Sequence, residues 1–313
     1  MILGNRTPLR GLLLGVGLAA VVTGVAVTQS VGAPTAQAGT PPLTWVARSP
    51  ATSPSARFSV AMAADTLTGQ VVLFGGVGSG GLASETWTWN GSSWTQQFPA
   101  TSPTATLFGD VMATDPTTGT PILFDGNTWS WSGSNWVELT PADSPPEYVD
   151  SSMATDTADR QIVLFGGGCN SDTWTWDGSN WTEQSPSSVP PGREAAAMAT
   201  DPTTGSVVMF GGNNCGTDGY INDTWIWAGS NWAQQSPLTS PPARGFAGFA
   251  PDPVLGQAVL FGGYDGSNML GDTWAWTGSD WTQLNPTTSP SDRDSMGMSA
   301  DPNGRIVLFG GVG

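Results

Sequence analysis

The stretch SDTWTWDGSNW, residues 171–181, places three tryptophans in the pattern Trp-x-Trp-x4-Trp. The pattern occurs five times in the 313-residue chain and accounts for all but one of its 16 tryptophans. An apolar run such as IVLFGG, residues 162–167, precedes each copy, and a sixth run at 306–311 has no tryptophan pattern after it. The apolar runs follow one another every 41 to 51 residues, which indicates a fold made of repeated units.

Each unit divides into four short β-strands. The first is rich in small residues, as in AAAMAT at 195–200, and ends at an Asp that begins a turn such as DPTTG at 201–205. The apolar run is the second strand, Thr-Trp-x-Trp is the third, and the last tryptophan begins the fourth. Repeated four-stranded units of this length are typical of the blades of a β-propeller.

The tryptophans have a structural interpretation and a functional one. Successive side chains of a strand point to opposite faces, so Trp174 and Trp176 share one face while Thr173 and Thr175 share the other. Each blade of a propeller packs between two neighbours, so both faces must fill space. Because the rings recur in register in all five units, we expect packing between blades rather than a ladder that stacks on carbohydrate.

Two incomplete units lie at the ends of the chain. Trp45 begins a fourth strand without the first three, and residues 293–313 supply first and second strands without the last two. Joined, they make a sixth blade from both chain ends, which removes the open edges of the ring. No Thr-Trp-x-Trp follows this last apolar run, so we expect the last blade to lack one strand. Either that blade is incomplete or the natural chain continues beyond Gly313, and we favour the second.

The order of the motifs resembles the kelch repeat: Gly-Gly, then Asp or Glu before Thr-Trp-x-Trp, then Gly-Ser-x-Trp, then Pro-x-x-Arg. Residues 44–313 are most similar to the kelch propellers related to the central domain of galactose oxidase. The resemblance implies an all-β, six-bladed kelch-type β-propeller whose last blade is built from both chain ends. The second unit departs from the pattern, since Asp125 stands in place of the first Gly.

The resemblance does not extend to the oxidase activity. That family needs copper held by histidines and a Tyr–Cys crosslink, whereas this chain has no His and only three tyrosines, Tyr148, Tyr220 and Tyr264. The absence of His and Lys also excludes Ser-His-Asp nucleophiles, imidazole metal sites and pyridoxal Schiff bases. We therefore identify no catalytic residue and favour a protein that is not an enzyme.

The N-terminus indicates export. Arg6 and Arg10 precede an apolar run at 11–27, and a following AQA motif matches a signal-peptidase site. We expect a signal peptide at 1–38, cleaved at its end, and then a mature N-terminal segment at 39–43. An uncleaved membrane anchor is the alternative. The mature protein is expected to be a monomer that is secreted, extracellular or in the cell envelope, with no membrane contact.

The net charge limits the partners. It is −16 for the whole chain and 7 − 25 = −18 without the first 38 residues, whose only charged residues are two arginines. Such a chain repels phosphate backbones and anionic lipid, so nucleic acid and membrane surfaces are not expected ligands. Extracellular carbohydrate or protein is left as the expected ligand class.

Candidate binding residues lie in the loops between second and third strands, which differ from unit to unit. Variable loops on a rigid scaffold are the usual place for binding. Loops of the fourth and fifth units combine tyrosines with polar residues that suit sugar recognition: Tyr220, Tyr264, Asp218, Asp265 and Asn268. The alternative is that these are ordinary loop residues.

Four arginines stand at the starts of first strands, on the same face as the variable loops: Arg57, Arg193, Arg244 and Arg293. One interpretation is a ring that binds a carboxylate ligand, with Arg193 and Arg244 beside the tyrosine loops. The other is that each arginine pairs within its blade with the acid before Thr-Trp, such as Glu85, Asp223 or Asp272. Recurrence in register favours the second interpretation.

Two cysteines and several loop acids suggest further chemistry. Cys169 and Cys215 follow Gly-Gly in adjacent units, so in an exported protein they are candidates for a disulfide. They are too few for a metal site, and no metal or other cofactor is expected, although DGYIND and DGSN hold oxygen ligands that would suit calcium. Turn formation explains the same residues.

Three functions are consistent with the sequence. The first is an exported propeller that acts as a binding or scaffold module for extracellular carbohydrate or protein. The second is the propeller domain of a secreted carbohydrate-active enzyme whose catalysis uses carboxylates or lies beyond this chain. The third is a purely structural envelope protein. The sequence favours the first.

Overall fold

The computed structural model describes residues 25–27, 44–107, 110–215, 219–301 and 303–313. Within these ranges every helix-or-strand element is a β-strand, so the protein is all-β. No helix suited to crossing a membrane is found in the described part of the chain. The predicted signal peptide and mature N-terminal segment lie largely outside the described residues.

Five four-stranded antiparallel sheets follow one another along the chain, here called sheets 1 to 5. Sheet 1 consists, in spatial order, of β4 (Ala61–Asp65), β5 (Gln70–Phe74), β8 (Thr86–Trp89) and β9 (Trp94–Gln97), and sheet 2 of β10 (Val111–Thr114), β11 (Pro121–Phe124), β12 (Thr128–Trp131) and β13 (Trp136–Leu139). Sheet 3 consists of β14 (Ser152–Asp156), β15 (Gln161–Gly167), β16 (Asn170–Trp176) and β17 (Trp181–Gln184), and sheet 4 of β19 (Ala197–Thr200), β20 (Val207–Phe210), β23 (Thr224–Trp227) and β24 (Trp232–Gln235). Sheet 5 consists of β25 (Gly248–Asp252), β26 (Gln257–Phe261), β27 (Thr273–Trp276) and β28 (Trp281–Leu284). Each sheet has the four strands that the sequence predicts.

A sixth four-stranded sheet, the terminal sheet, combines both ends of the described chain. Its strand order is β2 (Trp45–Ala47), β1 (Val25–Val27), β30 (Ile306–Val312) and β29 (Asp294–Ala300). Two small three-stranded sheets complete the structure: β3 (Arg57–Phe58) with β6 (Val77–Gly78) and β7 (Gly81–Leu82), and β18 (Arg193–Glu194) with β21 (Asn213–Asn214) and β22 (Gly219–Tyr220).

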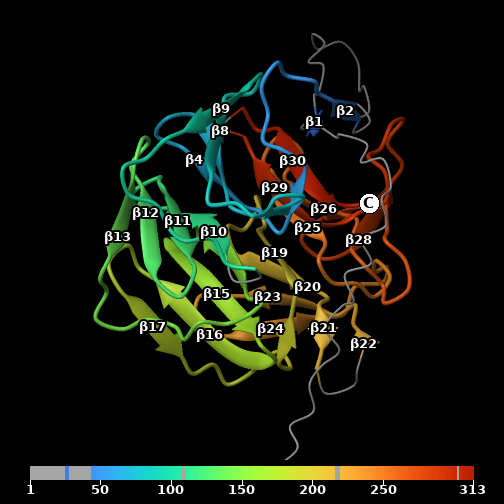
Figure 1. The fold of residues 1–313 in the computed structure, drawn as a ribbon. Coiled ribbons are helices and arrows are strands. Elements are labelled where there is room, and N and C mark those ends of the chain that lie inside the picture. Colours follow the sequence, from blue (N-terminus) through green and yellow to red (C-terminus); the bar gives the residue numbers. More distant parts are fainter. Residues whose placement is uncertain (1–24, 28–43, 108–109, 216–218, 302) are drawn as a thin grey trace, which may run out of the picture.

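The first strands of the six four-stranded sheets contact one another in cyclic order. β4 contacts β10, β10 contacts β14, β14 contacts β19, β19 contacts β25, β25 contacts β29, and β29 contacts β4. Figure 1 shows the sheets arranged around a common centre, with β13 and β17 at the outside. Small sheets whose inner strands surround one axis are consistent with a β-propeller.

The turns that follow the first strands are held by buried aspartates, as the sequence predicts. Asp65 Oδ1 accepts hydrogen bonds from the N–H groups of Leu67 and Thr68, both at 3.1 Å. The corresponding aspartates of the other sheets do the same over two to four residues: Asp115, Asp156, Asp201, Asp252 and Asp301. These side chains satisfy turn N–H groups that would otherwise lack partners.

The tryptophans form the core between neighbouring sheets. All 16 are buried, with no more than 9% of any side chain exposed. Trp174 and Trp176 pack against sheet 2, while Thr173, on the opposite face, accepts a hydrogen bond from Trp232 Nε1 of sheet 4 at 2.9 Å. The expected division of faces is therefore confirmed. The rings are not accessible for stacking on carbohydrate, so that alternative is wrong.

Residues 44–313 supply three strands of the last unit, β2, β29 and β30, as the sequence predicts, and the fourth strand of the terminal sheet comes from outside this range. β1, from within the predicted signal peptide, lies between β30 and β2 and pairs antiparallel with both. Without it, both strands would present unpaired backbone groups to solvent, and any extended segment within reach can satisfy them. Val25–Val27 has no Thr-Trp-x-Trp pattern, so the repeat does not reveal this strand.

Candidate functional site

The variable loops and the starts of the first strands lie together on one side of the sheets, here called the loop face. β21 pairs with β18 just before sheet 4, β6 pairs with β3 just before sheet 1, and Tyr264 forms a bridge with Gly245 just before sheet 5. The second Gly of each Gly-Gly allows this close approach. A Cβ on Gly212, whose φ is +102°, would lie 2.9 Å from the carbonyl oxygen of Glu194.

Three of the four arginines pair with acids of their own sheet, so the second interpretation holds for them. The N···O distances are 2.7 Å for Arg57–Glu85, 2.6 Å for Arg193–Asp223 and 2.5 Å for Arg244–Asp272. Each guanidinium also donates to the carbonyl of the first Gly in Gly-Gly. The same acids accept a hydrogen bond from the first tryptophan of the third strand: Trp87, Trp225 and Trp274. We call this arrangement the arginine–acid pair.

Burial makes the arginine–acid pair a structural element. The side chains of Arg193 and Arg244 are fully buried and use their donors within the sheet, which leaves them behind the surface that a ligand would reach. Burial opposes ionisation of Asp272, but hydrogen bonds from Arg244 and Trp274 outweigh it and hold the pKa of Asp272 below its ordinary value. We therefore leave both arginines out of the ligand surface proposed below.

Sheets 2 and 3 replace the pair in different ways. In sheet 2, Leu107 stands in the place of the arginine and Asn127 in the place of the acid, and Asp125 accepts the Trp129 Nε1 hydrogen bond instead, at 3.2 Å. In sheet 3, Tyr148 stands in the place of the arginine, and its hydroxyl donates to Asp172 Oδ2 at 2.5 Å. The departure at Asp125 is thus a local substitution for a missing acid.

The tyrosines of the fourth and fifth units meet on the loop face, as the sequence predicts. The rings of Tyr220 and Tyr264 lie edge to face, with centroids 5.7 Å apart and an interplanar angle of 89°. Tyr220 lies over the backbone of Gly245, where an added Cβ would approach its Cε1 to 2.6 Å, and beside Gly266. Both rings remain partly exposed. The glycines therefore fix the position of an aromatic pair at the surface.

The polar residues beside this pair belong to a tight turn. Asp265 Oδ1 accepts hydrogen bonds from the N–H groups of Ser267 and Asn268, both at 2.7 Å, and these bonds lower the pKa of Asp265. The Asn268 side chain is exposed. Asp218, the remaining candidate, lies outside the described residues. The structure thus brings four of the five loop candidates to one region.

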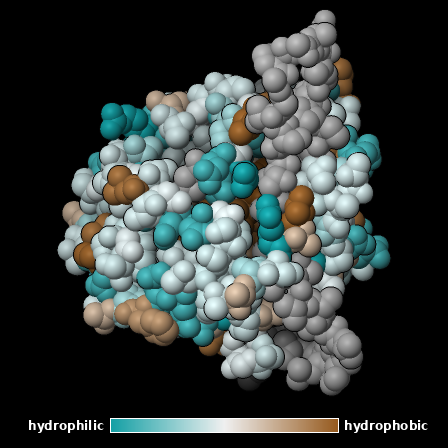
Figure 2. All heavy atoms as spheres, turned by 90° about the horizontal axis from the view of Figure 1, so that it is seen from above, coloured by the Kyte–Doolittle hydropathy of each residue, from teal (hydrophilic) through white to brown (hydrophobic). Residues whose placement is uncertain are grey.

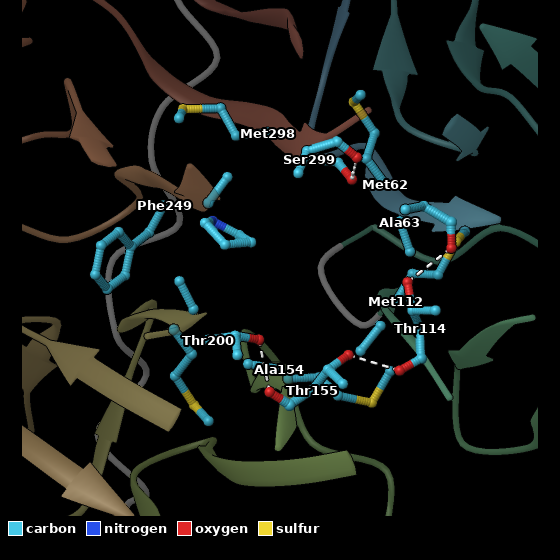
Figure 3. A pocket seen from close by; sticks show the side chains of 18 residues that line it. Met62, Ala63, Met112, Thr114, Ala154, Thr155, Thr200, Phe249, Met298 and Ser299 are labelled. Atoms are coloured by element: carbon cyan, nitrogen blue, oxygen red, sulfur yellow. Dashed lines mark hydrogen bonds between the residues drawn. The ribbon is translucent and has the colours of Figure 1, made fainter. Parts of the chain in front are cut away.

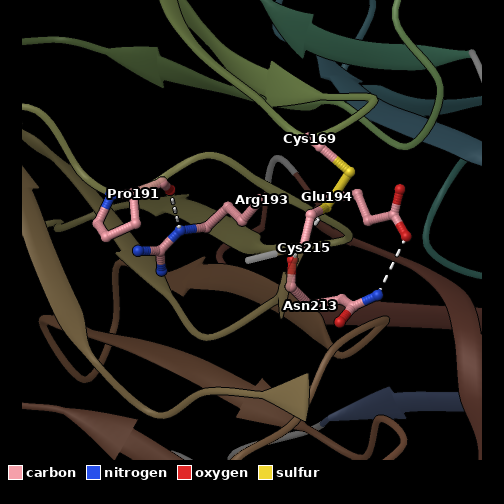
Figure 4. The surroundings of a disulfide bond; sticks show 6 residues. All are labelled: Cys169, Pro191, Arg193, Glu194, Asn213 and Cys215. Atoms are coloured by element: carbon pink, nitrogen blue, oxygen red, sulfur yellow. Dashed lines mark hydrogen bonds between the residues drawn. A yellow bond between two sulfur atoms is a disulfide. The ribbon is translucent and has the colours of Figure 1, made fainter. Parts of the chain in front are cut away.

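The predicted disulfide is present and ties the loop face together. Cys169 and Cys215 are bonded, with their Cα atoms 5.6 Å apart, and link the loop of sheet 3 to the small sheet before sheet 4 (Figure 4). Glu194 lies next to the two sulfurs and accepts a hydrogen bond from Asn213 Nδ2 at 3.1 Å. In the described residues this is the only cluster of three or more His, Cys, Asp or Glu with metal-binding distances. Disulfide sulfurs are not thiolate ligands, so the cluster offers a single carboxylate.

A cavity of about 140 Å³ opens at the centre of the loop face. Five residues around it have φ between +52° and +57°, although none is glycine: Ser59, Asp150, Ala195, Phe246 and Ser295. Their backbones form a chain of hydrogen bonds from sheet to sheet, from Ser59 N–H to Ser295, Phe246, Ala195 and Asp150 in turn, at 2.8–3.0 Å. Left-handed backbone costs about 1–2 kcal/mol per residue, and these hydrogen bonds offset it. The mouth of the cavity is therefore fixed in shape.

Asp110 is the unusual residue of this cavity. Burial raises its pKa to about 6, although the N–H and hydroxyl of Thr106 both donate to its carboxylate. The matching positions in other sheets hold apolar or small residues, such as Val60 and Ala196. No motif of the sequence indicates Asp110 as a site residue. A carboxylate at a position that is otherwise small and apolar was the signal that could have found it.

A second cavity, of about 110 Å³, lies deeper along the axis and is lined by residues of all six first strands (Figure 3). The hydroxyls of Thr114, Thr155 and Thr200 donate to the carbonyls of Ala64, Thr114 and Thr155, so that neighbouring first strands are joined side chain to backbone. These bonds at 2.6–2.7 Å connect strands rather than offer groups to a ligand. The deeper cavity is a packing feature of the inner strands.

Neither a scan against protein-family models nor a search of curated proteins finds a match to this chain. Inference about its function therefore rests on the residues themselves. The loop face combines the tyrosine pair, the exposed Asp265–Asn268 turn and the cavity mouth. Phe246, at the cavity, directly follows Gly245, which supports the Tyr220 ring.

Proposed function

We propose that the protein is an exported, six-bladed kelch-type β-propeller that binds extracellular carbohydrate or protein through its loop face. The propeller comprises residues 44–313, and a signal peptide at 1–38 and a short mature segment at 39–43 precede it. Six sheets, the cyclic contacts of their first strands and the mixed origin of the terminal sheet support six blades closed by both chain ends. Cleavage at the end of the signal peptide would remove β1 and leave β2, β30 and β29 as the terminal blade. A monomer suffices for this role.

The observation that carries the proposal is the Tyr220–Tyr264 pair. Two aromatic rings from loops of adjacent sheets lie 5.7 Å apart, with Tyr220 packed on the backbones of Gly245 and Gly266 and the Tyr264 hydroxyl donating to the Gly266 carbonyl at 2.9 Å. Fixed, partly exposed tyrosines beside an amide and a carboxylate offer an apolar stacking surface and hydrogen-bonding groups, which is the combination that sugar rings require. On the side of the molecule in Figure 2, apolar residues are scattered and do not gather into one large patch.

Thermal unfolding in the presence of a panel of sugars and acidic peptides tests the proposal. A ligand at 100 times its dissociation constant adds about 2.7 kcal/mol to stability, which raises Tm measurably. The shift should disappear in Tyr220→Ala/Tyr264→Ala and persist in Phe98→Ala, an exposed aromatic of sheet 1. Gly245→Ala retains both tyrosines but displaces the Tyr220 ring, so it should weaken binding. An undiminished shift in the double variant would exclude this site.

Asp110 favours a second candidate, a carboxylate-based carbohydrate-active enzyme. A carboxylic acid with a pKa of about 6 in a cavity can donate a proton near neutral pH, and Asp150 lines the same cavity. Glycoside hydrolysis uses such a pair of carboxyl groups. In this case turnover of a glycoside would be lost in Asp110→Asn and in Asp150→Asn but kept in the tyrosine double variant.

A further inference from the structure

In most sheets the arginine and the acid of the arginine–acid pair are either both present or both absent. Sheets 1, 4 and 5 have both the arginine and the acid, and sheet 2 has neither. Sheet 3 has a tyrosine that donates to its acid. Among the described residues, the terminal sheet alone has the arginine, Arg293, without an acid paired with it. This sheet therefore contains the arginine of an arginine–acid pair but not its acid.

Arg293 is buried and has only neutral partners among the described residues. Its side chain donates to the carbonyl of Gly310 at 2.8 Å and to the carbonyl and hydroxyl of Ser291 at 3.0 and 2.6 Å. The residue is 4% exposed, and desolvation lowers its pKa. The next residue, Asp294, is also buried, but no ion pair joins it to Arg293, and its Oδ1 accepts from Ser295. A buried guanidinium without a carboxylate is costly.

Trp94, which faces the terminal sheet, also lacks a hydrogen-bond partner that its equivalents in the other sheets have. In five sheets the tryptophan that begins the fourth strand donates its Nε1–H to a threonine of the preceding sheet, the one directly before the first tryptophan of the third strand: Trp136 to Thr86, Trp181 to Thr128, Trp232 to Thr173, Trp281 to Thr224 and Trp45 to Thr273, at 2.8–3.2 Å. The sheet that precedes Trp94 in the ring is the terminal sheet. Trp94 packs against Val307 and Phe309 there, and its buried Nε1 has no hydrogen-bond partner.

Trp45 provides a third sign. In sheets 1 to 5 the tryptophan of the fourth strand contacts the second tryptophan of the third strand, with ring centroids 5.2–5.5 Å apart. Trp45 makes the other contact of these tryptophans, with the Phe of the preceding sheet, since its ring lies 5.3 Å from that of Phe261. Its own sheet provides no aromatic partner within the described residues.

The pairing register of β1 with β30 and β2 shows which partners Arg293, Trp94 and Trp45 lack. Val25 pairs with Leu308 and Ala47 as Trp87 pairs with Leu73 and Gln96, and Val27 pairs with Trp45 as Trp89 pairs with Trp94. Val25 and Val27 therefore stand at the two tryptophan positions of a third strand. In the sequence, Thr23 and Gly24 precede Val25, so this stretch does not have the acid and the Thr that precede the first tryptophan in acid-Thr-Trp-x-Trp.

We propose that the place held by β1, between β30 and β2, is a receptor site for an extended strand of a partner polypeptide with the pattern acid-Thr-Trp-x-Trp. The acid pairs with Arg293, the threonine accepts the Trp94 Nε1–H, and the second tryptophan contacts Trp45. Backbone hydrogen bonds to β30 and β2 supply the rest of the affinity, as in β-strand addition. This site is separate from the tyrosine pair. β1 occupies it in the uncleaved chain, and removal of the proposed signal peptide at 1–38 would take β1 away and leave the place open.

Binding of a peptide to the uncleaved chain, residues 1–313, tests the site. The probe is a fluorescein-labelled peptide with the sequence of residues 84–91, SETWTWNG, which already forms such a strand in sheet 1. Ala26→Pro removes a backbone donor from β1 and opens the site, and Ala26→Gly weakens β1 more mildly in case the proline variant does not fold. Fluorescence polarisation should show affinity in the order Ala26→Pro, Ala26→Gly, wild type.

The peptide series assigns the contacts. Changing the Glu of the peptide to Gln should weaken binding about tenfold or more, and Arg293→Gln should abolish that difference. Changing the Thr to Val should weaken binding, and Trp94→Phe should abolish that second difference. Arg160→Gln, an exposed arginine of sheet 3, serves as the control and should change nothing.

Three outcomes would overturn the proposal. The first is that neither Ala26 variant binds the peptide. The second is equal affinity for the Glu and Gln peptides, which would show that Arg293 does not read the acid. The third is that light scattering finds the Ala26 variants as dimers that exclude the peptide, which would make a second copy of the chain the occupant.

Discussion

Sheets 4 and 2 solve the same structural problem with different chemistry. In sheet 4, Arg193 and Asp223 form a buried ion pair that joins the start of the first strand to the start of the third. In sheet 2, Leu107 and Asn127 occupy those positions, both exposed, and Asp125 takes over the tryptophan hydrogen bond. The ion pair is therefore not required for a four-stranded sheet of this type to form.

The difference correlates with the length of the loop. Sheet 4 has a long loop between its second and third strands, which includes β21 and β22, whereas in sheet 2 only Asp125, Gly126 and Asn127 separate the two strands. A short hairpin is determined by its own backbone hydrogen bonds, such as Asp125 N–H to Asn127 at 3.2 Å. A long loop needs an anchor at its base, and the arginine–acid pair provides one. The pair thus allows loops to vary without loss of the sheet.

Breaking the pair in sheet 4 should have the largest effect. Arg193→Met leaves the Asp223 carboxylate half-buried without its cation, and loss of one partner of a buried ion pair costs about 3–5 kcal/mol. Leu107→Met, the matched change in sheet 2, should stay within about 0.5 kcal/mol because the side chain is exposed. Urea unfolding of both variants measures the contrast. Equal losses would mean that the two sheets do not differ in this way.

The disulfide adds a second anchor on the same side of the molecule. Replacing Cys169 and Cys215 by Ser opens a loop of 46 residues and should cost about 2–4 kcal/mol. Hydrogen exchange should increase in β21 and β22, next to the bond, and remain unchanged in the sheet 2 hairpin. Unfolding of the wild-type protein with and without reductant provides the same comparison without mutation. Unchanged exchange in β21 would show that the arginine–acid pair alone anchors this loop.

The anchors of sheet 4 could be predicted from the sequence because they recur in register. Arg193, Asp223 and their equivalents stand at fixed distances from the tryptophans, and Cys169 and Cys215 occupy equivalent loop positions. Periodicity therefore predicted the strands, the tryptophan core, the ion pairs and the disulfide. The proximity of Tyr220 and Tyr264 followed from the same reasoning, since loops of adjacent units are neighbours.

Features that break the repeat could not be predicted in this way. β1 pairs through its backbone, which any extended segment can do, so no side-chain pattern reveals it. The environment of Asp110 depends on the cavity mouth, which five left-handed residues of distant sequence create together. The departure at Asp125 was visible, but its role required the distance to Trp129. The role of a residue that occurs once depends on its three-dimensional surroundings, whereas the role of a residue that recurs in every unit can be inferred by comparing the units.

Asp110, just before the first strand of sheet 2, is a partly buried acid whose pKa is raised, in contrast to the ion-paired acid of sheet 4. Its pKa is raised to about 6 in the folded protein, so between about pH 4 and 6 the folded state holds a proton that the unfolded state has lost. Stability therefore falls as pH rises through this window and the penalty is complete above it. Asp110→Asn should stabilise the protein by about 1–3 kcal/mol at pH 7 and by nothing below pH 4. Urea unfolding against pH measures the difference, and a stabilisation that does not vary with pH would contradict the raised pKa.

Sheet 3 is intermediate between sheet 4, which has the ion pair, and sheet 2, which has no pair. Breaking its Tyr148–Asp172 contact should cause the smallest loss of stability among these predictions. Tyr148 donates to Asp172 at 2.5 Å, and both this bond and burial raise the pKa of Tyr148, so the hydroxyl stays neutral and the contact is a hydrogen bond rather than an ion pair. Tyr148→Phe removes the bond but leaves Asp172 partly in water, so the loss should be about 0.5–1.5 kcal/mol.

A double-mutant cycle separates this bond from packing of the ring. If Tyr148 and Asp172 act as a pair, Tyr148→Phe/Asp172→Asn should cost less than the sum of the single changes. A loss for Tyr148→Phe as large as that for Arg193→Met would mean that charge is not what distinguishes sheet 4. The predicted order of losses, Arg193 first, Tyr148 second and Leu107 last, follows how much charge each position holds away from water.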